Sequence, residues 1–182
     1  MSLPIINSFQ AFSAVQNYDI VYSWDGNQSY GSTIEVYNNT TNVLVYSNSV
    51  TSFLLKNTIV ANNLSNGTTY YVKLKVKFQD GTYSQWSDSL VFQCLAIPVV
   101  SLNISQSQII QDSNYNVIFT YSQAQSEELN EWKLVLYDSN SVQLLNTDYI
   151  YATSAMNYNL TGLENAKQYQ VEIQYVTVHG MT

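Results

Sequence analysis

The chain has 182 residues, enough for one large or two ordinary domains, and 46% of them are hydrophobic, which excludes a disordered polypeptide. Only 10% of the residues are charged, arginine is absent, and the formal net charge is −7. Phosphate contacts supply most of the affinity for nucleic acids, so an acidic chain without arginine is a poor nucleic-acid binder. No apolar run is long enough to cross a membrane. We therefore expect neither a nucleic-acid partner nor membrane insertion.

Apolar residues recur at every second position almost throughout the chain, which is the period of a strand with one buried face. In chain order, these stretches cover residues 17–24, 32–37, 42–47, 70–78, 117–121, 131–137, 142–146 and 168–175. Turn pairs such as Asn66-Gly67 and Asp80-Gly81 separate them. Only residues 125–132 hint at a helix, and they are few enough to form a loop. The sequence predicts an all-β fold.

Two distant stretches of the chain follow the same pattern. "LSNGTTYYVKLKV" begins at Leu64, and "LENAKQYQVEIQY" begins 99 residues later at Leu163. In both, a tyrosine follows the leucine after five residues and apolar residues then alternate. Other strands of the two halves correspond at intervals of 97 to 100 residues. An interval of this size is the length of a whole sandwich domain, so we interpret the chain as two copies of one domain.

These features resemble a tandem pair of fibronectin type III domains. That family carries a tryptophan on its second strand, which Trp24 matches and Tyr121 replaces in the second copy. It also carries a tyrosine corner, matched at Tyr70 and Tyr169. The resemblance implies two immunoglobulin-like β-sandwiches, at residues 1–97 and 98–182, joined through "LAIP". It implies one core built on Trp24, Leu64, Tyr70, Val72, Leu74 and Val76, and another on Tyr121, Leu134, Leu136, Leu163, Tyr169, Val171 and Ile173.

The two copies end differently. In the first, "TYSQWSDSLVFQCL" follows Gly81 and supplies a seventh strand. In the second, only Met181 and Thr182 follow the equivalent Gly180. We expect the second domain to lack its last strand, and we interpret the sequence as a piece of a longer chain. The first residues lack the pattern of a secretory signal.

The residue types that carry chemistry are few and scattered. His179 is the single histidine, and it is expected at a strand end or in a loop. Glu127, Glu128 and Glu131 lack the spacing of a calcium loop and are expected to form a solvated acidic loop. Cys94 cannot form an intramolecular disulfide and is expected at a buried strand end. We therefore expect no catalytic residues, no metal site and no cofactor, and the chain is predicted not to be an enzyme.

The stretch "YSQWS" at 83–87 is the sharpest local feature, and it resembles the WSxWS box of one branch of these domains. There the aromatic side chains stack with cations of the adjacent strand. Here the available cations are Lys73, Lys75 and Lys77, which share the outward face of the 70–78 strand. We expect lysine stems to cover Tyr83 and Trp86 in a structural stack. The alternative is that the two aromatic residues form a platform for a ligand.

Three functions fit this organisation. The first is a structural module of a phage virion, in a tail, baseplate or fibre, with other virion subunits as partners. The second is an adhesion or spacer module of a bacterial surface or secreted protein. The third is a carbohydrate-binding accessory module that uses exposed aromatic residues to bind a cell-surface glycan. All three place the chain in a virion, outside the cell or at the cell surface, and the fold cannot choose among them.

Overall fold

The structure is a computed structural model that describes residues 2–152 and 155–182. The regular elements of these residues are strands, which form two compact units, Met1–Ala96 and Ile97–Thr182. None of the described residues belongs to a helix of the length and hydropathy that crossing a membrane requires. Residues 125–132, which carry the hint of a helix, form a loop at 125–128 and the first part of a strand at 129–132.

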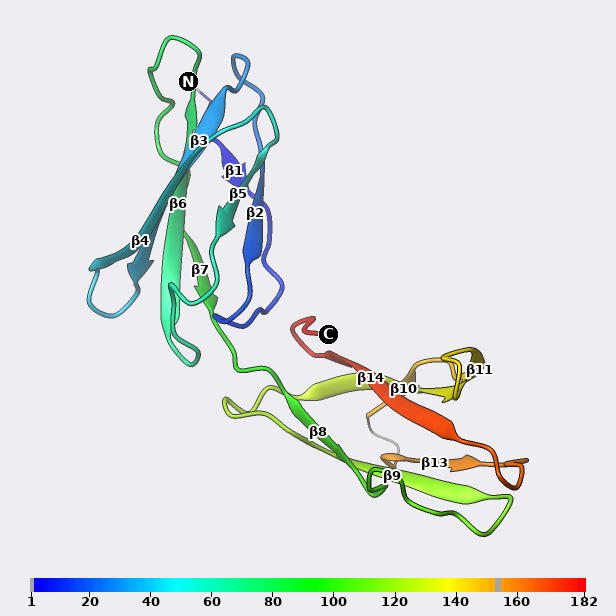
Figure 1. The fold of residues 1–182 in the computed structure, drawn as a ribbon. Coiled ribbons are helices and arrows are strands. Elements are labelled where there is room, and N and C mark those ends of the chain that lie inside the picture. The colour runs from blue at the N-terminus through cyan, green and yellow to red at the C-terminus, as the bar shows by residue number, and fades with distance from the viewer. Residues whose placement is uncertain (1, 153–154) are drawn as a thin grey trace. The chain divides into compact units, whose positions relative to one another are not determined.

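The first unit is a sandwich of two antiparallel sheets (Figure 1). One sheet has the order β1-β2-β5, with strands Ile5–Ile6, Tyr18–Ser23 and Lys56–Ile59. The other has the order β4-β3-β6-β7, with strands Leu44–Thr51, Gly31–Asn38, Thr69–Lys77 and Leu90–Gln93. The long strand β6 lies in the middle of this second sheet, between β3 and β7, so both of its edges are paired.

The second unit repeats this plan with a different sheet edge. One sheet has the order β8-β9-β13, with strands Val99–Leu102, Tyr115–Ser122 and Asn157–Leu160. In the other, β10 (Leu129–Asp138) pairs with β11 (Gln143–Asn146), β12 (Ile150–Tyr151) and β14 (Tyr169–Thr177). The partner of β14 among the described residues is β10 alone, so its other edge carries no strand where β6 carries β7.

The core of the first unit follows the alternation of β6. Tyr70, Val72, Leu74 and Val76 are buried, as is Leu64 before them. The prediction that these five residues form the first core is confirmed. Apolar alternation places the same parity of side chains inward along the whole strand, so sequence parity is enough to find them.

The prediction that Trp24 is a core residue is met only in part, because its indole packs against the buried cluster without being buried itself. Strand β2 ends at Ser23, and its inward residues Ile20 and Tyr22 fill the core beside it. Trp24 follows the strand in a loop, where it is half-buried and packs against Phe78 with ring centroids 6.0 Å apart. The indole therefore lies at the rim of the core and not at its centre.

The fully buried tryptophan of the molecule is Trp132, on β10 of the second unit. It packs edge-on against Phe119 of the opposite sheet, with centroids 4.8 Å apart. Leu134 and Leu136 on the same strand are buried as predicted. Tyr121 does not belong to this core, because it lies near the end of β9 and its hydroxyl binds the following loop.

The other residues predicted for the second core contact it, but their side chains remain partly exposed to solvent. Leu163, Tyr169, Val171 and Ile173 pack against the buried cluster but remain half-buried. In the first unit, β7 lies beside β6 and brings the buried ring of Phe92 over the core. No described strand does this for β14, so the same alternating pattern produces a less complete core.

Candidate functional site

The outward face of β6 carries a stack of one lysine and two aromatic rings. The Lys75 Nζ lies 4.3 Å from the centre of the Tyr83 ring and 4.6 Å from that of Trp86. A cation–π contact of this kind contributes about 0.5–1 kcal/mol at an exposed site, and the lysine stem also covers apolar ring surface. The chain reversal after β6 folds the Tyr83–Trp86 segment back over the strand, so these residues meet although they are about ten positions apart.

The other two lysines of the face do not join this stack. Lys73 Nζ lies 5.7 Å from the Tyr37 ring and 5.6 Å from the Tyr71 ring, which are themselves stacked 5.0 Å apart. Lys77 contacts this region through its backbone. Its backbone forms a bridge with Tyr83, and its carbonyl accepts a hydrogen bond from Tyr30 N–H. The structure thus brings the side chains of Lys75, Tyr83 and Trp86 together, whereas Lys73 packs on other rings and Lys77 contacts Tyr83 through its backbone.

The two serines of the "YSQWS" stretch have a role that the sequence analysis missed. The Oγ atoms of Ser84 and Ser87 accept hydrogen bonds from the backbone N–H groups of Val76 and Leu74, at 2.9 and 3.0 Å. The backbone N–H groups of the same serines donate to the carbonyls of Val76 and Leu74. β7 pairs with β6 only as far as Val72. Beyond that point the two serines provide the hydrogen-bond partners for the backbone groups at this edge of β6.

A cavity of about 720 Å³ lies where three loops of the first unit meet, and we call it the loop-end cavity. Its wall consists of residues 24 and 26–30 between β2 and β3, Phe53 between β4 and β5, and 78–80 and 82–85 after β6, together with Ser2. Trp24 is held rigidly in this wall. Its Nε1–H donates to the Asn27 carbonyl at 2.6 Å, and a Cβ on Gly26 would lie 2.2 Å from the indole.

A second aromatic pair lines the loop-end cavity. The rings of Tyr30 and Phe53 meet edge-to-face with centroids 5.7 Å apart, and Phe53 is 66% exposed. Around these rings lie side-chain amides, which belong to Asn27, Gln28, Gln79 and Gln85. Among the lining residues Asp80 alone is charged, and Thr82 hydrogen-bonds its carboxylate twice. These hydrogen bonds lower the pKa of Asp80.

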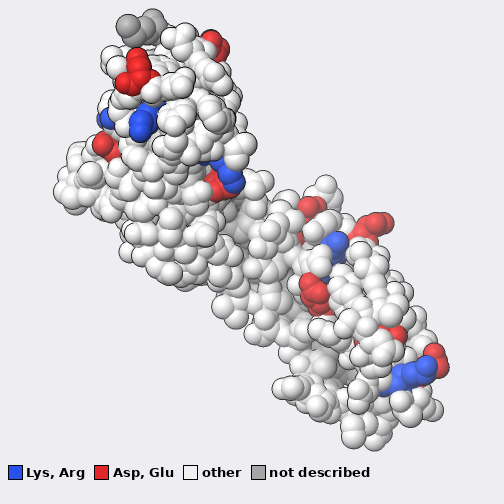
Figure 2. Space-filling model, turned by 45° about the horizontal axis from the view of Figure 1, so that its top comes forward, with Lys and Arg blue, Asp and Glu red and all other residues white. Residues whose placement is uncertain are grey.

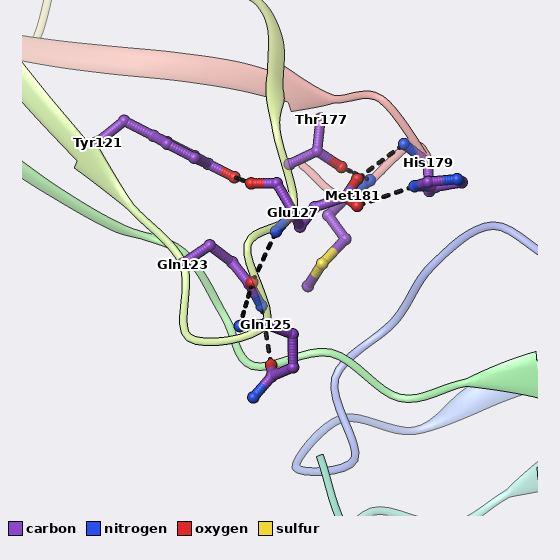
Figure 3. A network of polar contacts seen from close by, with 7 residues as sticks. All are labelled: Tyr121, Gln123, Gln125, Glu127, Thr177, His179 and Met181. Atoms are coloured by element: carbon purple, nitrogen blue, oxygen red, sulfur yellow. Dashed lines mark hydrogen bonds and ion pairs between the residues drawn. The ribbon is translucent and has the colours of Figure 1, made fainter. Parts of the chain in front are cut away.

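The second unit carries a polar network in place of a solvated acidic loop. The prediction for Glu127 is wrong, because its side chain is buried and accepts hydrogen bonds from the backbone N–H and the Nδ1 of His179, both at 2.8 Å (Figure 3). His179 itself lies in a turn after β14, as expected. The Tyr121 hydroxyl donates to the Glu127 carbonyl at 2.9 Å. The network therefore ties the loop before β10 to the turn after β14.

Opposing influences act on the pKa of the Glu127 carboxyl. Burial raises the pKa, but the hydrogen bonds from His179 and Thr177 outweigh it and hold the pKa below its ordinary value. The Thr177 Oγ1 also accepts the Met181 N–H at 3.0 Å, which closes the turn. The Glu127 carboxylate is thus held by several donors, which is typical of a polar network that stabilises the fold.

Candidate groups for chemistry are sparse among residues 2–152 and 155–182. These residues contain no cluster of three or more histidine, cysteine, aspartate or glutamate side chains placed to hold a metal ion. Cys94 is buried at the end of β7, and burial raises the pKa of its thiol to about 12. The thiol is therefore protonated at neutral pH and is a poor nucleophile.

Comparison with known proteins identifies the fold. The chain resembles the crystal structure of the FN1–FN3 domains of chicken CNTN1, with a TM-score of 0.58, 12% sequence identity and 98% of this chain covered. It spans 63% of the length of that structure. At this identity the likeness shows the architecture, that of fibronectin type III sandwiches in tandem. No family model matches the sequence, and no curated protein matches it.

Proposed function

We propose that the chain is a non-enzymatic structural and interaction module, and that it serves in a phage virion as part of a tail, baseplate or fibre. The observation that carries the proposal is the tandem of two sandwiches, each with its own buried core. A unit that folds around its own core can be repeated along a chain to space or present other parts of an assembly. Its partners are then other subunits of the particle.

The surface supports a role in an exposed assembly. Figure 2 shows a face on which acidic and basic side chains are few and most of the surface consists of uncharged residues. Asparagine, serine, threonine, glutamine and tyrosine provide solvation where most proteins use charge. Such a surface makes weak long-range fields, so contacts with neighbours depend on shape and hydrogen bonding. The virion placement is favoured by this arginine-free composition together with the tandem domains.

The proposal is tested by locating the protein. Antibodies raised against the chain are applied to density-gradient fractions from induced cultures of the source organism, and to negatively stained particles from the same gradients. The virion role predicts that the protein sediments with intact particles, resists washing at high salt, and is labelled on tails or fibres. Recovery in the cell-envelope or secreted fraction, with unlabelled particles, would overturn the virion role and support the bacterial surface module.

A further inference from the structure

The loop-end cavity has the size and the mixed lining of a ligand site. Its volume of about 720 Å³ lies within the range of roughly 300–1,000 Å³ that is typical of small-molecule sites. Three separate loops of one sandwich form its wall, and the two sheets hold the ends of those loops. The cavity therefore lies at the loop end of the sandwich, and two of its wall residues, Trp24 and Phe78, also pack against the core.

The cavity combines a fixed indole with an exposed phenyl ring. Trp24 is fixed by its hydrogen bond to Asn27 and by the close approach of Gly26, and Phe78 packs against it. Phe53, by contrast, is a large apolar ring left 66% exposed at the mouth. Rings that are fixed before binding lose little conformational freedom when a ligand stacks on them.

The side-chain amides beside these rings are uncharged and are available for hydrogen bonds to a ligand. Within the part of the chain that the structure describes, the side-chain amides of Asn27, Gln28, Gln79 and Gln85 make no hydrogen bond to the protein. Each offers two donors and one acceptor oxygen. The single lining carboxylate, on Asp80, is already bound by Thr82. The site therefore offers hydrogen bonds without a free cation to balance an anionic ligand.

We infer that the loop-end cavity binds a neutral saccharide. A pyranose ring presents an apolar face of C–H groups, which stacks on aromatic rings, and a rim of hydroxyls, which pair with amide donors and acceptors. The cavity supplies both kinds of surface side by side. An acidic sugar is disfavoured, because its carboxylate would meet Asp80 and no unpaired lysine. This inference is independent of the virion placement, since a spacer or a surface module could carry the same site.

The experiment uses the full chain and reads the tryptophans separately. ¹⁵N-labelled protein is titrated with neutral oligosaccharides chosen from a glycan array, and the three indole N–H resonances are followed. The inference predicts a saturable shift of the Trp24 resonance and no shift of the Trp132 resonance, which lies in the other unit. It also predicts that sialylated versions of the same glycans bind at least tenfold more weakly.

Matched variants separate the site from the surface around it. Phe53→Ala should weaken binding at least tenfold with an unchanged melting temperature, because the ring is mostly exposed. Leu54→Ala is the control, because the neighbouring Leu54 is 62% exposed and does not line the cavity. Gln79→Ala combined with Gln85→Ala should also lower the affinity. An array without binding to neutral glycans, or equal affinity of the Phe53→Ala variant, would overturn the inference.

Discussion

The hydroxyl of Tyr70 accepts a hydrogen bond from the backbone N–H of Ser65 at 2.9 Å. The same contact recurs 99 residues later, where the Tyr169 hydroxyl accepts from Glu164 N–H at 3.0 Å. In each unit a phenol that packs at the core, buried in Tyr70 and half-buried in Tyr169, thus ties its strand to the turn that precedes it. Two such tyrosine corners, at equivalent places, are direct structural support for a duplicated sandwich.

Replacing the first of these tyrosines should destabilise one unit and spare the other. Tyr70→Phe keeps the buried ring and removes the hydroxyl, so we expect a loss of about 0.5–1.5 kcal/mol in the unfolding free energy of the first unit. Tyr169→Phe should act in the same way on the second unit. Urea unfolding of both variants checks this, and a loss shared equally by both units in either variant would contradict it.

Trp24 in the first unit and Trp132 in the second should differ in the stability lost when each is replaced. Trp132 is fully buried, so Trp132→Ala should cost about 3–5 kcal/mol, whereas Trp24 is half-buried at a rim and Trp24→Ala should cost distinctly less. Thermal unfolding of the two variants gives the comparison. An equal or larger loss in Trp24→Ala would show that the core of the first unit extends to the indole.

The hydrogen bond from Leu74 N–H to the Ser87 hydroxyl should contribute to the stability of the first unit. Ser87→Ala removes the acceptor of the buried Leu74 N–H, and a buried donor left without a partner costs about 1–3 kcal/mol. Ser89→Ala is the matched control, because Ser89 is exposed and the substitution should change stability by no more than about 0.5 kcal/mol. Indistinguishable melting of the two variants would mean that water replaces the serine hydroxyl.

The Glu127 network should make the second unit sensitive to acid. The folded state lowers the pKa of Glu127 below its ordinary value of 4.5, so the carboxylate contributes stability above that pH. This contribution is lost as the pH falls through the lower pKa of the folded state. Glu127→Gln should cost about 1–3 kcal/mol at neutral pH, because two donors of His179 lose a charged acceptor.

The same variant should also change the shape of the pH profile. Melting temperatures of the second unit, measured from pH 7 down to pH 3, should fall less steeply in Glu127→Gln than in the wild type. Glu128→Gln on the adjacent exposed residue serves as the control and should keep the wild-type slope. Parallel profiles for all three proteins would exclude a role for the buried carboxylate.

The parts of the fold that could be predicted are those set by local period and spacing. Val72, Leu74 and Val76 were identifiable because strand geometry sends alternate side chains to one face. The tyrosine corners were identifiable because the interval between leucine and tyrosine is the same in both copies. Trp24 has the same parity as the inward residues of β2, but the strand ends one residue earlier, and parity cannot locate a strand end.

The parts that could not be predicted depend on contacts between distant segments. Glu127 is buried because His179, 52 residues away, supplies two donors to it, and nothing near Glu127 in the sequence indicates this. The loop-end cavity combines residues from three loops, so its lining has no local motif. The stack of Lys75 on Tyr83 and Trp86 was predictable in part. The sequence identifies the two aromatic residues and three candidate lysines, but it does not show which lysine contacts the rings.

Thermal unfolding of the full chain tests the central claim, that two separately folded sandwiches differ in how fully their cores are covered. Calorimetry should show two transitions. Fluorescence of the Trp24→Phe/Trp86→Phe variant, in which Trp132 reports on the second unit alone, should assign the lower transition to that unit. The reason is that the inward-facing apolar residues of β14 are half-buried, whereas those of β6 are buried. One cooperative transition, or a Trp132 signal that follows the higher of two, would contradict the account.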